Sequence, residues 1–200
     1  MEYLKRAGQP SAAAALLPSA WNPPTKAHVA LAEAALGHAG EVVFVLPRAF
    51  PHKQFDGPPA ETRMRWLVKL CGLSPRFSAA VSDGGLFVEM AGEARALGAE
   101  RVLIVCGSDA AERIAGWPYP QGLELERQLE TGYELLVAPR CAEWLPPARL
   151  AHRVHRLPLD GEIQVLSSTQ VRELIRSGGD WRSLVPEVLA DEIGSAYGRS

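Results

Sequence analysis

The chain has 200 residues, of which 47% are hydrophobic, and this is enough for one α/β domain with a sizeable core. Its formal net charge of −2 argues against a general nucleic-acid-binding protein, because that class needs a basic face. The three cysteines are widely separated and form no C-x-x-C pair, so they suggest neither a disulfide framework nor a zinc site. The apolar run Ala12–Leu17 is too short to span a bilayer. We therefore expect one cytoplasmic domain over residues 1–200, with no membrane or nucleic-acid partner.

Short apolar runs alternate with helical patterns along the chain. The expected strands are Ala12–Leu17, Val42–Leu46, Arg101–Cys106 and Tyr133–Ala138. Apolar residues at helical spacing occur between them, over Thr25–Leu36, Glu61–Cys71 and Leu86–Leu97. This alternation predicts an α/β fold with a doubly wound parallel sheet, followed by a small helical portion at about 167–200. Ligands of such sheets bind beyond the carboxyl ends of the strands.

The segment Asn22–His28 lies where the first strand should turn into the first helix. Free backbone N–H groups and the positive end of the helix dipole would face the ligand crevice there. Thr25 and His28 are three residues apart, so a hydroxyl and an imidazole could bind the same phosphate chain. Phosphoryl transfer depends mainly on such positioning and charge stabilisation. Taken alone, the segment fits equally well a turn in which Thr25 caps the helix and His28 has no special role.

Three later segments, taken in order after Ser19–His28, are informative together. They are Pro51-His52-Lys53 with Glu61-Thr62-Arg63, Gly107-Ser108-Asp109 with Trp117, and Ser167–Arg172 with Ser183-Leu184-Val185-Pro186. In this order the segments resemble the nicotinamide or nicotinate mononucleotide adenylyltransferases, which belong to the nucleotidyltransferase superfamily with a His/Thr-x-x-His motif. The resemblance runs from about Leu16 to Ile193. It implies a Rossmann-like fold and a role in NAD biosynthesis: adenylyl transfer from ATP to a pyridine mononucleotide, forming the dinucleotide and pyrophosphate.

The resemblance also implies the catalytic residues. Thr25 and His28 would stabilise charge on the transferring α-phosphate, and no protein nucleophile is needed. Arg172 would grip the phosphate chain from the opposite side together with Ser168, since a guanidinium fork suits phosphate oxygens. Lys53 would neutralise the mononucleotide phosphate or the pyrophosphate. The alternative for Ser168 and Arg172 is a capped helix with a solvated arginine. The alternative for Lys53 is a surface lysine.

The nucleotide-binding positions implied by the resemblance are Ser19, Ala20, Gly107, Asp109, Ser168 and Thr169. Gly107 lets the backbone approach a ligand closely, and Asp109 could accept hydrogen bonds from sugar hydroxyls. Asp109 could equally be the N-cap of the helix that follows.

The mononucleotide would contact Trp117, by stacking on the pyridine ring, and Arg140, at the rim after the fourth run. The alternative for Trp117 is a core tryptophan. The expected metal is Mg²⁺ carried by ATP and held largely by phosphate oxygens and water, with no protein ligands. His152 and His155 have helical metal-ligand spacing but lack an acidic partner pattern. Family analogy also allows a homo-oligomer.

The sequence departs from the family pattern in three places. Pro18-Ser19-Ala20 stands where the family has two small residues, and since Pro18 has no N–H, part of an anion-binding nest is expected to be missing or rearranged. Gly84–Met90 and the Pro-rich segment 117–122 also differ. Two alternatives therefore stay open. One is a nucleotidyltransferase for another acceptor, such as a pantetheine or polyol phosphate; the other is a catalytically poor nucleotide-binding regulator.

Overall fold

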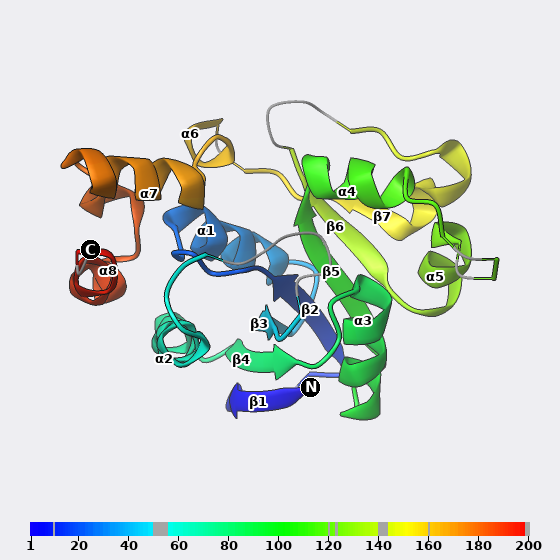
Figure 1. Cartoon of the computed structure of the whole chain (residues 1–200). Helices are drawn as coiled ribbons and strands as arrows, with labels where there is room; N and C mark the ends of the chain where they lie inside the picture. Colours follow the sequence, from blue (N-terminus) through cyan, green and yellow to red (C-terminus); the bar gives the residue numbers. More distant parts are fainter. Residues whose placement is uncertain are drawn as a thin grey trace.

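The computed structural model describes residues 1–9, 11–49, 56–119, 121–122, 124–139, 144–159 and 161–198. Within these residues, seven strands form one sheet in the order β1-β4-β3-β2-β5-β6-β7 (Figure 1). Their bounds are β1 Glu2–Lys5, β2 Ala13–Pro18, β3 Glu41–Pro47, β4 Phe77–Ser82, β5 Arg101–Gly107, β6 Glu134–Ala138 and β7 Val154–Arg156. The strands that we predicted from the apolar runs are β2, β3, β5 and β6.

The direction in which the chain adds strands to the sheet reverses between β2 and β5. The chain adds β3 and β4 on one side of β2, then crosses to β5 on the other side and continues to β6 and β7. All of these neighbours pair in parallel. The predicted doubly wound parallel sheet is thus confirmed, and a crevice is expected at the switch point, beyond the carboxyl ends of β2 and β5.

Three strands were missing from the prediction. β1 pairs antiparallel with β4 at the edge, so the sheet is not wholly parallel. β4 reads FSAAVS, and its small and polar residues hide it from an apolar-run search although every residue of it is buried. β7 has only three residues, too few to show a period.

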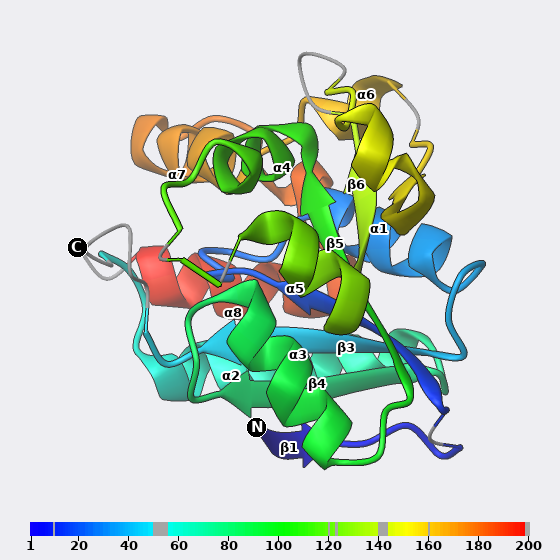
Figure 2. The same ribbon diagram turned by 90° about the vertical axis from the view of Figure 1, so that its right-hand side faces the viewer.

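Helices cover both faces of the sheet. Figures 1 and 2 show α1, α2, α7 and α8 on one side and α3, α4 and α5 on the other. The bounds are α1 Lys26–Ala35, α2 Ala60–Leu70, α3 Phe87–Ala96, α4 Ser108–Ala115, α5 Leu125–Thr131, α6 Gly161–Gln164, α7 Ser168–Ser177 and α8 Ala190–Tyr197. Short 3-10 helices span Cys71–Leu73, Ala148–Arg153, Arg182–Leu184 and Glu187–Leu189.

Each face of the sheet has its own hydrophobic cluster. Successive side chains of β2 point to opposite faces, so Leu17 belongs to the cluster that contains Trp66 of α2, while Leu16 belongs to the cluster that contains Met90 of α3. A strand that is buried on both sides has no polar face, and this explains why β2 and β3 are continuous apolar runs. The helices thus bring residues from distant parts of the chain to the two faces.

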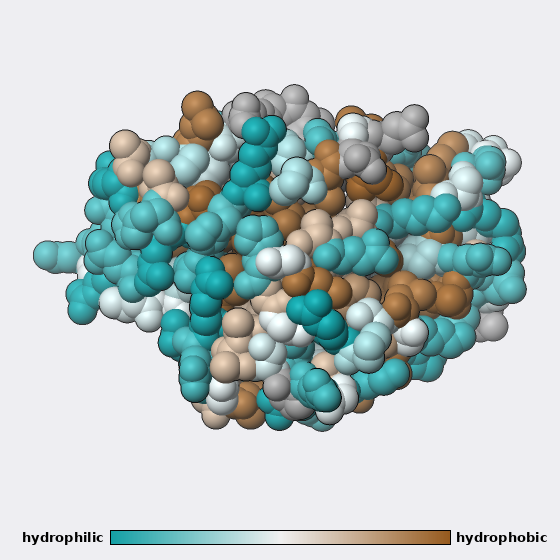
Figure 3. Space-filling view, turned by 180° about the vertical axis from the view of Figure 1, so that it is seen from behind, coloured by the Kyte–Doolittle hydropathy of each residue, from teal (hydrophilic) through white to brown (hydrophobic). Residues whose placement is uncertain are grey.

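The outer surface mixes residue types. In the view from behind, hydrophobic residues lie scattered among hydrophilic ones (Figure 3). No helix in the described part of the chain combines the length and the apolar character that crossing a membrane requires.

Glu134 joins three neighbouring strands at the end of the sheet where β5 and β6 begin. Its carboxylate oxygens accept hydrogen bonds from Arg101 Nε and Nη2, at 2.9 and 2.7 Å, and the second oxygen lies 2.6 Å from His155 Nε2 of β7. Arg153 Nη1 lies 3.5 Å away. The hydrogen bonds from Arg101, followed by that from His155, lower the pKa of Glu134 to about 2.

This ion cluster predicts a pH-dependent stability. A carboxyl group with a lowered pKa stabilises the fold above its unfolded pKa of about 4.3, and the effect is lost as the pH falls towards 2. Glu134→Gln should lower the free energy of unfolding at pH 7 by about 1–2 kcal/mol, a value reduced for partial solvent exposure. The variant should also lose less stability than the wild type between pH 5 and pH 2. Urea denaturation at several pH values measures both effects.

Glu126→Gln is the matched control. The Glu126–Arg149 pair is exposed, and such pairs contribute about 0–1 kcal/mol. Equal pH dependence in the wild type and Glu134→Gln would contradict the assignment.

Candidate functional site

A pocket of about 440 Å³ opens at the switch point of the sheet. Its wall includes residues that follow β2, the last residue of β5, residues of α1 and residues of α7. The predicted residues that the structure brings together here are Ser19, Ala20, His28, Gly107, Ser168, Thr169 and Arg172. This position agrees with the rule that ligands of doubly wound sheets bind beyond the carboxyl strand ends.

The turn from β2 into α1 is held from outside. Arg63 Nη1 of α2 donates to the carbonyl of Ala20 at 3.0 Å. Arg172 Nη1 donates to the carbonyl of Asn22 at 2.6 Å, and Ser168 Oγ donates to that of Pro23 at 2.7 Å. The two predicted phosphate ligands on α7 therefore also fix the backbone of the turn.

Trp21 anchors the same turn from within the core. It has φ 54°, in the left-handed region that residues other than glycine rarely adopt. Its ring is fully buried, its Nε1 donates to the Val45 carbonyl at 2.8 Å, and it packs 4.9 Å from the imidazole of His28 between ring centroids. Burial and this hydrogen bond stabilise the unusual backbone angle.

His28 is oriented by the residue that precedes its own helix. Its Nδ1 accepts the backbone N–H of Thr25 at 3.1 Å and lies 2.9 Å from the Thr25 hydroxyl. A backbone N–H can only donate, so Nδ1 carries no proton and Nε2 carries it when the ring is neutral. Thr25 itself is fully buried, so the structure places its hydroxyl behind His28, away from the pocket wall.

The Nε2 atom of His28 faces Ser19. The two atoms His28 Nε2 and Ser19 Oγ are 3.1 Å apart, and the backbone N–H of Trp21 also donates to Ser19 Oγ, at 3.4 Å. With two donors directed at its oxygen, the Ser19 hydroxyl keeps its own hydrogen for a further acceptor. Since Ser19 lines the pocket, this arrangement can donate to an anion bound there.

The N-terminus of α7 forms the opposite wall. Ser167 is its N-cap, and Ser167 Oγ accepts the N–H of Gln170 at 3.2 Å. Arg172 Nη2 donates to Thr169 Oγ1 at 3.1 Å. Arg176, which was not predicted from the sequence, also lines the pocket. Its spacing of four residues from Arg172 could have identified it, because that spacing places both guanidinium groups on one helix face.

Asp109 and Trp117 do not lie on this wall. Asp109 is exposed, and its carboxylate lies 3.8 Å from Arg113 on α4. The alternative that made Asp109 the N-cap is wrong, because α4 begins at Ser108 and its N-cap is Gly107. Lys53 and Arg140 lie outside the described residues.

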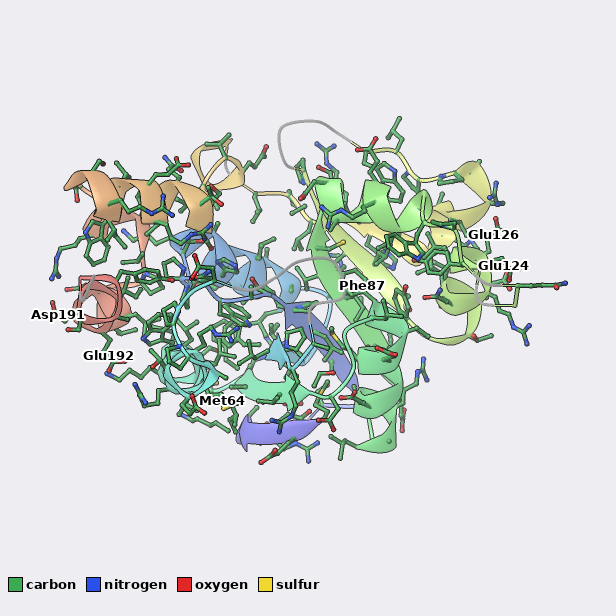
Figure 4. All side chains as sticks on the ribbon, in the orientation of Figure 1. Met64, Phe87, Glu124, Glu126, Asp191 and Glu192 are labelled. Atoms are coloured by element: carbon green, nitrogen blue, oxygen red, sulfur yellow. The ribbon has the colours of Figure 1, made fainter. Side chains whose placement is uncertain are left out.

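Trp117 lines a second pocket, of about 250 Å³. Phe87, near the start of α3 in Figure 4, shares this wall with Tyr119 and Tyr133. Gly107 belongs to the first pocket and Ala110 to the second, so both pockets meet the start of α4 within one helical turn. Trp117 is 42% exposed, so a planar ligand could reach it.

The site has few acidic groups. No cluster of three or more His, Cys, Asp or Glu side chains suited to a metal ion occurs among the residues that the structure describes. The polar groups of the first pocket are mainly hydroxyl, imidazole and guanidinium donors, which suit phosphate oxygens.

The chain is similar to known proteins in sequence pattern and in fold. Residues 16–174 match a family model described as cytidylyltransferase-like. The structure of Plasmodium falciparum nicotinic acid mononucleotide adenylyltransferase complexed with NaAD is similar, with a TM-score of 0.70 and 15% identity over 90% of this chain and 93% of that one. The same enzyme complexed with APC gives a TM-score of 0.68 and 14% identity, over 93% and 96% of the two chains. No curated protein sequence matches the chain.

The geometry predicts the tautomer of His28. In the free protein the neutral ring should carry its proton on Nε2, because Nδ1 accepts the Thr25 N–H. Long-range ¹H–¹⁵N NMR of ¹⁵N-histidine-labelled protein distinguishes the two ring nitrogens, and His28→Asn identifies the signals. A proton on Nδ1 would contradict the arrangement.

Proposed function

Because the chain belongs to the cytidylyltransferase-like family, we propose that it is a nucleotidyltransferase that joins the adenylyl group of ATP to nicotinate or nicotinamide mononucleotide. The products would be the dinucleotide and pyrophosphate. One observation carries this proposal: hydrogen-bond donors that suit phosphate oxygens converge on one pocket at the switch point of the sheet. His28 and Ser19 face it from one side. Arg172 and the N-terminal turn of α7 face it from the other, where Ser168 lines the pocket although its hydroxyl donates to the Pro23 carbonyl.

The chemistry needs positioned donors more than a reactive side chain. An oxygen of the mononucleotide phosphate attacks the α-phosphorus of ATP in line, forming the new P–O bond. The bond between the α-phosphorus and the bridging oxygen to the β-phosphate breaks, and its electron pair leaves with pyrophosphate. Ser19 Oγ accepts the Nε2–H of His28 in the free protein, and this N–H would be shared with the α-phosphate oxygen that gains charge. The Ser19 hydroxyl would donate its own hydrogen to the same anion, and both donors would lower the barrier electrostatically.

The other wall would hold the leaving group. Arg172 has further donors besides those that bind Asn22 and Thr169, so it can clamp the turn and bind the β- and γ-phosphates together. Arg176 adds a second cation on the same helix face. Mg²⁺ would arrive on ATP, held by phosphate oxygens and water. We propose Lys53 and Arg140 as partners of the acceptor phosphate.

The acceptor ring would bind in the second pocket. Trp117, Tyr119 and Phe87 offer aromatic surface there, and a flat pyridine ring gains from stacking on such surface. Pantetheine and polyol phosphates have no flat ring and gain little from it. The position of both pockets at the start of α4 supports one acceptor with its ring in the second pocket and its phosphate directed towards the first.

A pyrophosphate-release assay with ATP and a panel of phosphorylated acceptors tests the reaction. The wild type should release pyrophosphate with nicotinate or nicotinamide mononucleotide. His28→Ala should lower kcat by about 10²–10³-fold, the usual loss when one charge-stabilising donor is removed. Its circular dichroism spectrum should match that of the wild type.

His152→Ala is the control, because His152 is exposed in the 3-10 helix Ala148–Arg153. Wild-type turnover in His28→Ala would refute the proposed mechanism. Release only with a pantetheine or polyol phosphate would identify another acceptor, and ATP binding without any release would identify a regulator.

Trp117→Ala tests the acceptor pocket. It should raise KM for the mononucleotide about three- to tenfold, as expected for losing one aromatic contact, and leave KM for ATP unchanged. Trp117→Phe keeps an aromatic face, so its KM for the mononucleotide should lie between those of the wild type and Trp117→Ala. Steady-state kinetics with each substrate varied in turn gives both constants, and equal changes in both would place Trp117 outside the acceptor site.

A further inference from the structure

Tyr197, the last residue of α8, reaches back to the turn that follows β2. Its hydroxyl contacts the side-chain oxygen of Asn22, which is 175 positions earlier in the sequence. Asn22 Nδ2 donates to the carbonyl of Asp56 at 2.7 Å, so the amide oxygen is the atom that faces Tyr197. An amide oxygen only accepts hydrogen bonds, and the phenol must therefore be the donor.

The phenol keeps its proton at neutral pH. Burial raises the pKa of Tyr197 by more than the nearby guanidinium groups of Arg172 and Arg63 lower it. These two arginines are the ones that bind the carbonyls of Asn22 and Ala20. Tyr197 thus belongs to the group of side chains that hold the turn, although it lies in a helix outside the pocket wall.

The helix that carries Tyr197 is firmly attached. Glu192, labelled on α8 in Figure 4, forms an ion pair with Lys69 of α2. The Tyr197 ring stacks on the buried ring of Trp66, with centroids 6.4 Å apart and planes at 19°. Ile193, one turn before Tyr197, is fully buried. A hydroxyl on such a support can fix the position of its partner.

Asn22 is confined on its other side as well. A Cβ on Gly57 would come within 2.5 Å of Asn22 Oδ1, so the backbone passes close to the amide there. Asn22 is only 9% exposed. Tyr197, Asp56 and Gly57 therefore confine the Asn22 side chain to one orientation. The backbone carbonyl of Asn22 accepts the hydrogen bond from Arg172.

We propose that Tyr197 is a positioning residue for the nucleotide site. Its hydroxyl holds Asn22, and through Asn22 it holds the turn in the conformation that presents Ser19 and His28 to the pocket and gives Arg172 its carbonyl partner. The kinetic part of this inference rests on the proposed nucleotidyl transfer. The effect on the turn itself does not depend on it.

Tyr197→Phe tests the proposal, because it removes only the hydroxyl and keeps the ring on Trp66. Losing one hydrogen bond to a buried partner should lower kcat/KM for ATP about three- to tenfold and leave KM for the mononucleotide unchanged. Amide hydrogen exchange in a peptide covering residues 19–28 should be faster than in the wild type. Ser195→Ala is the control, since the Ser195 hydroxyl bonds to the Asp191 carbonyl within the same helix. It should change neither quantity.

A double-mutant cycle with Asn22→Ala separates positioning from packing. If Tyr197 acts through Asn22, adding Tyr197→Phe to Asn22→Ala should cause no further loss of kcat/KM or of exchange protection. The proposal would be overturned if Tyr197→Phe lowered kcat/KM by the same factor in the wild type and in Asn22→Ala. It would also be overturned if residues 19–28 of Tyr197→Phe exchanged their amide hydrogens at the wild-type rate. If the wild type releases no pyrophosphate with any acceptor, the proposed function fails, whereas the exchange measurements still decide the role of Tyr197.

Discussion

The turn between β2 and α1 does not satisfy the hydrogen bonds of its backbone carbonyls by itself. Side chains of neighbouring helices donate these hydrogen bonds. Pro23 and Pro24 have no N–H groups, and the carbonyls of Ala20, Asn22 and Pro23 accept hydrogen bonds from side chains on α2 and α7. Because two of these donors come from the C-terminal quarter of the chain, the turn has its observed conformation only when α7 is in place. The pocket is therefore a product of tertiary packing, and the local segment does not form it alone.

This dependence explains how the site combines structural and chemical roles. Arg172 binds a backbone carbonyl and lines the pocket, so its guanidinium group is already oriented before a ligand arrives. His28 is oriented in the same way by the N–H of Thr25, and it presents Nε2 to Ser19 and the pocket. Donors that need no reorganisation are the ones that stabilise developing charge best. The sheet gives the location of the site, and the turn with α7 gives its polarity.

The sequence was informative about some of these features and silent about others. Long Val- and Leu-rich strands and the helix starting after Thr25 were predictable, because burial on both faces and capping leave local patterns. β4 was not, since its serines and alanines are buried without an apolar signature. The motif located His28 near a pocket but could not show that Thr25 lies behind it. Nothing local marks Tyr197, whose role depends on a contact with Asn22 across the whole chain.

A crystal structure of the protein with Mg²⁺ and a non-hydrolysable ATP analogue would show which atoms face the phosphates. We expect an α-phosphate oxygen within hydrogen-bond distance of His28 Nε2. We also expect the β- and γ-phosphates against Arg172 and the N-terminal turn of α7 at Ser168, with the Arg172–Asn22 hydrogen bond kept. A triphosphate bound away from the β2–α1 turn, or a turn that rearranges to release Arg172, would contradict this arrangement.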